Sequence, residues 1–403
     1  GLGRRKCVLR VPPPALDRVA RQGYHPALGA RALKRALERE ITQPLARTVA
    51  RLKGHSPTLL TLAPGQDSLQ VLARPLMSAA PRDGSLAALG ELDAAEAHEL
   101  VDDALEQARL TMEKLRPREA ISGARIEQSH RAYFAIKAQA EKLRKLAERL
   151  GRHSHEDSSR IGRSSRMARH TRRHRERMEY AGQRAWRDFC SIEDVREFLV
   201  QSREEGQESE GQPSGAIRNL LGETALLQLL MRSAPRQDGR VVLLFESLNA
   251  ALPPQSARLA AQEAEVLREA FELAVRELDV RGLSHAKALL VEGTLARELA
   301  PLETGTHLFI VEGELAPVAV TALPLKARQK PEAVLNRLRL ARKRWWTEGG
   351  EEPYAPGPVL RVIHQSGQTL DLRSGGITRS EAGVGARRSY LLSALPLGHG
   401  EEE

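Results

Sequence analysis

Residues 23–35 read GYHPALGARALKR and contain the turn and the helix start on which our interpretation of the fold depends. Gly23 lies in a turn between two helices expected within residues 11–52. In the second helix, apolar residues recur every four positions, and we expect them to form one buried face: Leu33, Leu37, Ile41 and Leu45. Pro44 lacks the amide that would donate to the Glu40 carbonyl, so we expect a kink or a break there. Apolar runs at 58–62 and 68–72, separated by Pro64 and Gly65, then predict a β-hairpin.

The same stretch carries a family resemblance. The Gly-Tyr-x-Pro turn, the Gly-Ala-Arg helix start, Lys34-Arg35 and the interior Pro44-Leu45 resemble the C-terminal small subdomain of Clp-type AAA+ unfoldases over residues 1–76. The resemblance implies a small α+β lid subdomain that belongs to an ATP-driven ring.

The resemblance assigns a nucleotide sensor to Arg31, with Gly29 and Ala30 beside it. In the family this arginine reaches the terminal phosphate of ATP, which is held by a large subdomain that this chain lacks. Independently of the family, Gly29 permits close backbone approach, and an arginine in a first helical turn adds a bidentate cation to amides that already favour phosphate. The chain contains no Gly-x-x-x-x-Gly-Lys-Ser/Thr phosphate loop, and no apolar strand ends in an acidic pair that would bind magnesium. We therefore expect no ATP hydrolysis by this chain alone.

Residues 77–90 are rich in Ala, Pro, Ser and Gly, which predicts a linker, and residues 91–200 are expected to be helical and coiled-coil-like. Heptad spacing of apolar residues within 97–115 and 133–150 predicts an antiparallel helical hairpin that turns near 117–123.

A basic, Ser-rich segment at 151–179 falls within this helical region. It is either a solvated face or an electrostatic contact with RNA, the ribosome or an acidic client. The candidate contacts are Arg160, Arg163, Arg166, Arg169, Arg172 and Arg173. The acidic, Gly/Ser/Gln-rich residues 201–218 predict a disordered linker.

The last large region, 219–397, is predicted to be an α+β domain, followed by a frayed tail at 398–403. Strands are expected at 241–245, 286–291, 306–311 and 317–323, helices at 256–278 and 331–345, and a terminal hairpin formed by 359–363 and 369–372. Trp345 and Trp346 lie at the end of the basic helix predicted at 331–345, and we expect at least one of them to pack in the core.

The segment Glu303-Thr304-Gly305-Thr306-His307 resembles the Glu-x-Gly-x-His segment in the accessory domain of bacterial peptide chain release factors, within about residues 240–325. Leu308 stands where that family usually has Arg, and the Gly-Gly-Gln tripeptide that carries peptidyl-tRNA hydrolysis is absent. The resemblance implies a shared ribosome-derived fold used for binding rather than for release. For His307 we expect a structural place between strands, bonded to Glu303.

Composition restricts the class of protein. Lys and Arg number 62 against 52 Asp and Glu, so the net charge of +10 favours acidic partners. Aromatic residues make up only 3%, which disfavours a base-stacking single-strand binder. The only two cysteines, Cys7 and Cys190, lie far apart without a metal-ligand pattern, so neither a disulfide scaffold nor a metal site is expected, and a reducing cytoplasm fits. No apolar run is long enough to cross a membrane.

These observations predict a mixed α/β multidomain chain that forms the C-terminal part of a Clp-like ATP-dependent chaperone. Translation does not begin at Gly1, and the first methionine is Met77, so we expect a longer parent protein. No catalytic residue is expected within the chain. The expected partners are an AAA+ large subdomain, neighbouring protomers of a hexameric ring, and protein clients. The alternatives are a ribosome- or RNA-binding adaptor without catalytic activity, and a coiled-coil interaction protein.

Overall fold

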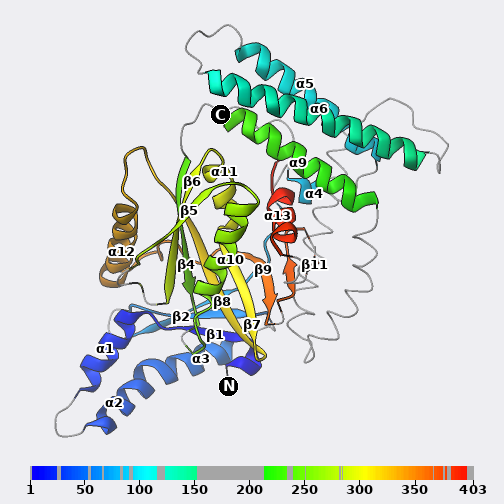
Figure 1. Ribbon diagram of the computed structural model, residues 1–403. Coiled ribbons are helices and arrows are strands. Elements are labelled where there is room, and N and C mark those ends of the chain that lie inside the picture. Colours follow the sequence, from blue (N-terminus) through cyan, green and yellow to red (C-terminus); the bar gives the residue numbers. More distant parts are fainter. Residues whose placement is uncertain are drawn as a thin grey trace.

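The computed structural model describes residues 2–24, 29–52, 56–65, 68–81, 85–89, 94–115, 123–151, 213–233, 239–249, 251–280, 283, 285–365, 367–374, 377–378 and 383–396. These residues form a three-stranded sheet, ordered β1-β2-β3, and an eight-stranded sheet, ordered β11-β10-β9-β7-β8-β4-β6-β5 (Figure 1). Helices pack on both sheets, so the predicted mixed α/β class is confirmed.

The small N-terminal unit combines the three-stranded sheet with helices. Its elements are a 3-10 turn (Gly3–Arg5), β1 (Cys7–Arg10), α1 (Pro13–Gly23), α2 (Ala30–Leu37), a π-helical turn (Glu38–Thr42), α3 (Gln43–Arg51), β2 (Thr58–Ala63) and β3 (Gln70–Pro75). β1 pairs with β2 in parallel, and β2 pairs with β3 antiparallel from Thr58↔Pro75 to Ala63↔Gln70. The predicted hairpin is therefore confirmed.

The helical part of this unit departs from the prediction in one respect. The break expected at Pro44 is present, because a π-helical turn ends at Thr42 and α3 begins at Gln43. The buried face predicted for the second helix is only partly confirmed. Leu45 is buried, whereas Leu33 and Leu37 are 40% and 39% exposed. The π-helical turn holds one more residue than an α-helical turn and thus rotates the helix face.

The larger sheet contains β4 (Gly239–Ser247), β5 (Ala274–Leu278), β6 (Ala286–Gly293), β7 (Gly305–Val311), β8 (Glu314–Pro324), β9 (Val359–His364), β10 (Thr369–Asp371) and β11 (Ile377–Thr378). All paired neighbours are antiparallel except β7 and β9, which are parallel. Both faces of β4 are covered: Leu243 and Phe245 join one core cluster, and Val242 and Leu244 join another. This double burial explains why β4 is continuously apolar instead of alternating.

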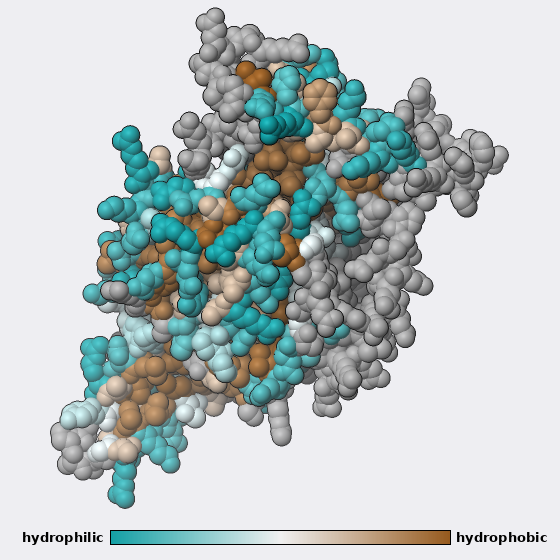
Figure 2. All heavy atoms as spheres, in the orientation of Figure 1, coloured by the Kyte–Doolittle hydropathy of each residue, from teal (hydrophilic) through white to brown (hydrophobic). Residues whose placement is uncertain are grey.

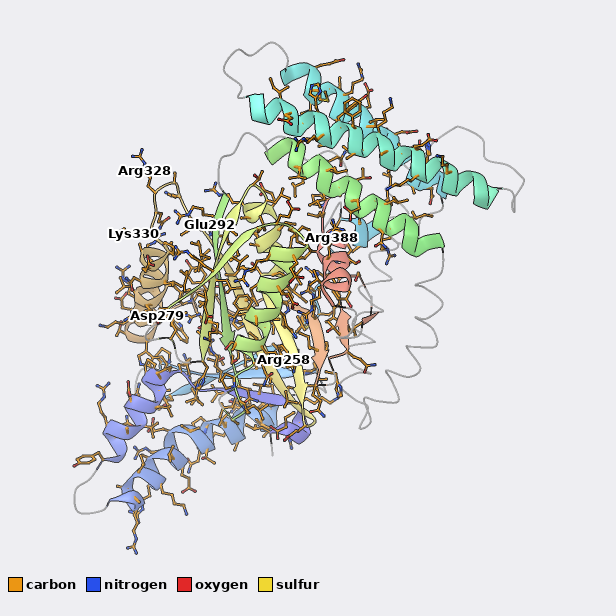
Figure 3. All side chains as sticks on the ribbon, viewed as in Figure 1. Arg258, Asp279, Glu292, Arg328, Lys330 and Arg388 are labelled. Atoms are coloured by element: carbon orange, nitrogen blue, oxygen red, sulfur yellow. The ribbon has the colours of Figure 1, made fainter. Side chains whose placement is uncertain are left out.

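Helices are stacked on one face of this sheet, some against the strands and some against other helices. They are α4 (Leu86–Leu89), α5 (Ala94–Leu115), α6 (Gly123–Gly151), α9 (Pro213–Ser233), α10 (Ser256–Glu269) and α13 (Gly383–Ser393). α5 and α6 form the predicted hairpin, in which Val101 and Ile136 are fully buried. They share one core with α9 and the sheet and do not stand apart as a separate coiled coil. Arg388 of α13 ties this layer together by donating from Nη2 to Glu223 Oε2 of α9 at 2.9 Å (Figure 3).

Three boundaries differ from the sequence prediction. The helix predicted at 256–278 ends at Glu269, where a left-handed Glu272 (φ 54°) turns the chain into edge strand β5. Within 201–218, residues from Pro213 onward belong to α9, because Ile217 is buried in the main core. The predicted linker 77–90 is also tied down: the Ala79 amide donates to the Val359 carbonyl, and α4 is buried.

The opposite face of the larger sheet carries α12 (Pro331–Glu348) and the small unit (Figure 1). One core cluster joins apolar residues of both units: Val8, Leu59 and Leu76 from the small unit with Leu308, Ile310, Val359 and Val362 from the large sheet. Arg10 also forms an ion pair with Glu352. The small unit is thus anchored through its sheet, while the end of α1 and α2 points away from the large sheet (Figure 1). None of the described helices combines the length and the hydropathy that crossing a bilayer requires.

Candidate functional site

The predicted sensor arginine lies at the free end of the small unit. α2 begins at Ala30, so Arg31 occupies its first turn, with an exposed side chain. Gly29 precedes the helix at φ 50° and ψ −131°, a conformation that favours glycine, and a Cβ added there would meet no atom within 4 Å. Arg31 forms no ion pair with another described residue. The backbone amides of this turn and the guanidinium are therefore open to an anionic group supplied from outside the chain.

The other predicted binding residues cannot be placed in this way. Arg160, Arg163, Arg166, Arg169, Arg172 and Arg173 lie outside the described residues, as does the whole of 152–212. The structure therefore brings none of them to Arg31 or to any other site. Trp345 is buried, as expected for at least one of the two tryptophans, and its ring packs edge-on against Trp346 with centroids 6.0 Å apart.

A buried ion network in the C-terminal region is the most highly charged part of the described core. Arg361, in the middle of β9, makes a bidentate pair with Glu303, in which Nη1–Oε2 is 2.7 Å and Nη2–Oε1 is 2.8 Å. It also donates to Glu263 of α10 at 3.1 Å and to Asp371 of β10 at 3.1 Å. Arg373 adds a second cation by donating to Asp371 at 2.7 Å and to the Leu302 carbonyl at 2.7 Å.

One further contact closes the network. The Arg361 guanidinium lies 5.3 Å from the ring centre of Tyr390 on α13. Every charge in this group is matched inside the protein, with exposed fractions of 5% or less. Among the described residues, no group of three or more His, Cys, Asp or Glu is arranged to hold a metal ion. The network therefore fixes the relative positions of α10, β9, β10 and α13, and it is not open to a ligand.

The pKa values follow from this burial and pairing. For Asp371, burial alone would raise the pKa, but Arg373 and Arg361 outweigh it and lower the pKa to about 2. The pKa of Glu303 is lowered for the same reason, since Arg361 and Arg373 overcome its desolvation. For Glu263, desolvation and the neighbouring Glu303 raise the pKa to about 7. Desolvation lowers the pKa of His307 to about 4. At neutral pH His307 is neutral, while Glu303 and Asp371 are ionised.

The Glu303-x-Gly305-x-His307 segment now has a physical explanation. Glu303 holds Arg361, and its backbone carbonyl lies 3.2 Å from His307 Nε2, so the predicted His307–Glu303 bond is confirmed. Gly305 has φ 155°, and a Cβ there would lie 2.7 Å from Leu360 Cγ and 2.8 Å from the Pro358 carbonyl oxygen. The glycine is needed because β9 passes at this distance.

We expect Gly305→Ala to lower the free energy of unfolding by about 2–3 kcal/mol, because it adds both backbone strain and overpacking. Urea unfolding followed by circular dichroism measures the loss. Gly385→Ala is the matched control, since a Cβ at this helical position meets nothing within 4 Å. Equal stability of the two variants would contradict the close approach of β9.

Protonation gives this network two opposing effects on stability. Between pH 4.5 and about 7, native Glu263 binds more proton than unfolded Glu, so its contribution to the free energy of unfolding falls as pH rises. Between about pH 4 and 6.5, native His307 binds less proton than unfolded His, so its contribution rises with pH. The two slopes, each at most about 1.4 kcal/mol per pH unit, offset each other in the wild type.

When one of the two groups is replaced, the pH dependence of the free energy of unfolding should therefore show the contribution of the other group. Relative to wild type, Glu263→Gln should make the free energy of unfolding rise more steeply from pH 4.5 to 6.5, and His307→Gln should make it fall. Urea denaturation at half-unit pH steps tests this. Parallel curves for the two variants would contradict the assigned pKa shifts.

Sequence reasoning missed Arg361, Glu263 and Asp371. Arg361 lies 98 residues from Glu263 and 58 from Glu303, so no local spacing connects them. The one available signal was an arginine inside the apolar run Val359–Ile363, because a charge in a buried strand requires a buried partner.

Comparison with known proteins bears on the two resemblances. The family model of the C-terminal, D2-small domain of the ClpB protein matches residues 2–57. A search of curated proteins gives no match. Among solved structures, RF2 of Thermus thermophilus aligns at 14% sequence identity and a TM-score of 0.29, covering 72% of this chain and 98% of that chain. A TM-score this low carries no argument about the fold. Residues 2–57 are therefore similar to the D2-small domain of ClpB, a Clp-type AAA+ protein, as the GYHPALGARALKR stretch indicates.

Proposed function

We propose that this chain is the C-terminal part of a Clp-like AAA+ ATP-dependent chaperone, in which the small unit couples the nucleotide state to subdomain rotation in a ring. The match of residues 2–57 to a D2-small domain carries the proposal. The chain itself would not hydrolyse ATP. An AAA+ large subdomain would hold the nucleotide, and Arg31, beside Gly29 and Ala30, would contact its terminal phosphate.

The arrangement of the small unit supports this role. Arg31 is exposed and has no ionic partner among the described residues, as a residue that completes a site on another subdomain requires. The opposite side of the small unit is fixed to the large sheet by the core that includes Leu59 and Leu308. A rotation imposed at Arg31 would therefore carry the C-terminal domain with it and move any partner docked there.

Exposed apolar side chains on the small unit support contact with a neighbouring protomer. Leu16 and Tyr24 of the α1 segment are 52% and 78% exposed, and Leu33 and Leu37 of α2 are exposed as well. Figure 2 shows apolar atoms gathered over α1 and α2, at the lower left. Apolar patches of this kind mark interaction surfaces.

The native product tests the proposal. An antibody raised against this chain would isolate it, and its intact mass and N-terminal sequence would be determined. We expect a mass much larger than 44.5 kDa and a phosphate-loop motif upstream of the small unit. A native product that starts at Gly1 would contradict the proposal and favour the ribosome- or RNA-binding adaptor.

A further inference from the structure

A cavity of about 840 Å³ lies between the small unit and α12. One wall is the end of β1, the Pro12–Pro14 segment and α1, and the opposite wall is the C-terminal half of α12. Residues 246–248 at the end of β4, with Leu283 and His285, complete the lining. Arg328 and Lys330 mark the N-terminal end of α12 (Figure 3), and most of the α12 residues that line the cavity come from the other half of this helix. Junctions between domains are a common place for ligand sites.

Both walls of this groove are basic. Five cationic side chains line it: Arg10 and Arg21 from the small unit, and Arg339, Arg342 and Lys343 from α12. Two acidic residues line it as well, and both are already engaged, Glu246 with Arg342 and Glu352 with Arg10.

Three of these cations have no acidic partner within the described part of the chain. Arg21 and Lys343 are exposed and form no ion pair with any described residue, and Arg339 is held only by Asn336 Oδ1, at 3.4 Å. The groove therefore presents about three unmatched positive charges to any ligand.

The groove also has an apolar component. Leu340 lines it and is 57% exposed. Trp345, Trp346 and the prolines of the other wall continue the apolar surface. Tryptophan and arginine are the residue types enriched at the energetic centres of protein interfaces.

The distribution of charge distinguishes among anionic ligands. A phosphate chain concentrates its charge and is typically held by backbone amides at a helix N-terminus. The cations here are spread over the C-terminal half of α12 and a second wall opposite it, an arrangement that suits charges distributed along a ligand. An extended peptide directs alternate side chains to opposite sides, so its carboxylates can reach both walls.

We propose that the groove between α1 and α12 binds an extended acidic peptide of a partner protein, with an apolar side chain against Leu340 and carboxylates on Arg21, Arg339 and Lys343. This deepens the partner-docking role in the proposed function and rests on it. Binding to a site shared by both units would also link the docked partner to the orientation of the small unit.

Fluorescence anisotropy tests the groove in the full chain without nucleotide. The probe is a fluorescein-labelled peptide of about eight residues with one central leucine and with glutamates at both odd and even positions, so that carboxylates point to both sides of the extended chain. We expect micromolar binding that weakens at least tenfold in R339E/K343E and in Leu340→Asp. The matched control is R337E/R344E, which makes the same charge change at two exposed positions of α12 outside the groove and should change the Kd by less than about twofold.

Each other outcome overturns the proposal. If the wild-type chain does not bind the peptide at concentrations up to millimolar, the groove is not a peptide-binding site. Equal weakening in the control variant means general attraction to a basic surface. If a peptide with glycine in place of leucine binds equally well, the ligand makes no apolar contact with Leu340. If micromolar ATP or triphosphate displaces the probe, the groove is a phosphate site. The binding experiment needs no nucleotide. A failure to bind peptide would therefore not bear on ATP coupling, and a failure of the ATP-turnover test would not change the measured peptide affinity.

Discussion

Replacing Arg361 by alanine is expected to lower the free energy of unfolding by about 3–5 kcal/mol, because it leaves buried carboxylates without their cation. Arg361 is 3% exposed and donates to Glu303, Glu263 and Asp371. Arg373 contacts Asp371 closely but lies 3.8 Å from Glu303, so it cannot replace the bidentate pair. Desolvated charges without partners are among the few causes of losses this large.

Urea unfolding at pH 7 measures this loss. Arg276→Ala on edge strand β5 is the control, since Arg276 is exposed and its removal should change stability by no more than about 0.5 kcal/mol. Arg361→Met combined with Glu303→Gln should be less destabilised than Arg361→Met alone, because the second change removes an unpaired charge. If Arg361→Ala matches the control, the network does not hold the domain together.

Local sequence patterns predicted the small unit and the individual strands of the large sheet. The β2–β3 hairpin, the break before Pro44 and the strands β4, β6, β7 and β8 all follow from periodicity and proline chemistry, which act within a few residues. The resemblance carried by GYHPALGARALKR is likewise local, and a family model covers the same residues.

Features set by long-range packing could not be predicted. The exposure of Leu33 and Leu37 depends on a π-helical turn that the four-residue spacing of the apolar positions does not reveal. α13 has weak periodicity and is stabilised by contacts with α9 and α10, and β5 continues an apolar pattern that also fits a helix. The groove between α1 and α12 exists only because two units far apart in sequence meet.

Arg31→Ala in the intact protein is expected to slow ATP turnover by about 100-fold, the usual cost of removing one preorganised group that stabilises developing phosphate charge. Arg31 lies in the first turn of α2, exposed and without an ionic partner among the described residues, so its loss breaks no ion pair with any of them. The thermal unfolding midpoint should therefore stay within a few degrees of wild type.

Arg47→Ala is the matched control for this effect. Arg47 is exposed on α3 in the same small unit and carries the same charge. It belongs to the helix after the π-helical turn, away from the first turn of α2. Turnover within about twofold of wild type is expected, because surface substitutions outside a site have small effects.

The most direct test of the account is the ATP turnover of the intact native protein with Arg31→Ala, measured beside Arg47→Ala under saturating nucleotide. We expect a loss of about two orders of magnitude for Arg31→Ala alone, with the small unit still folded. Unchanged turnover in a folded Arg31→Ala protein would contradict it, because the small unit would then not sense the nucleotide.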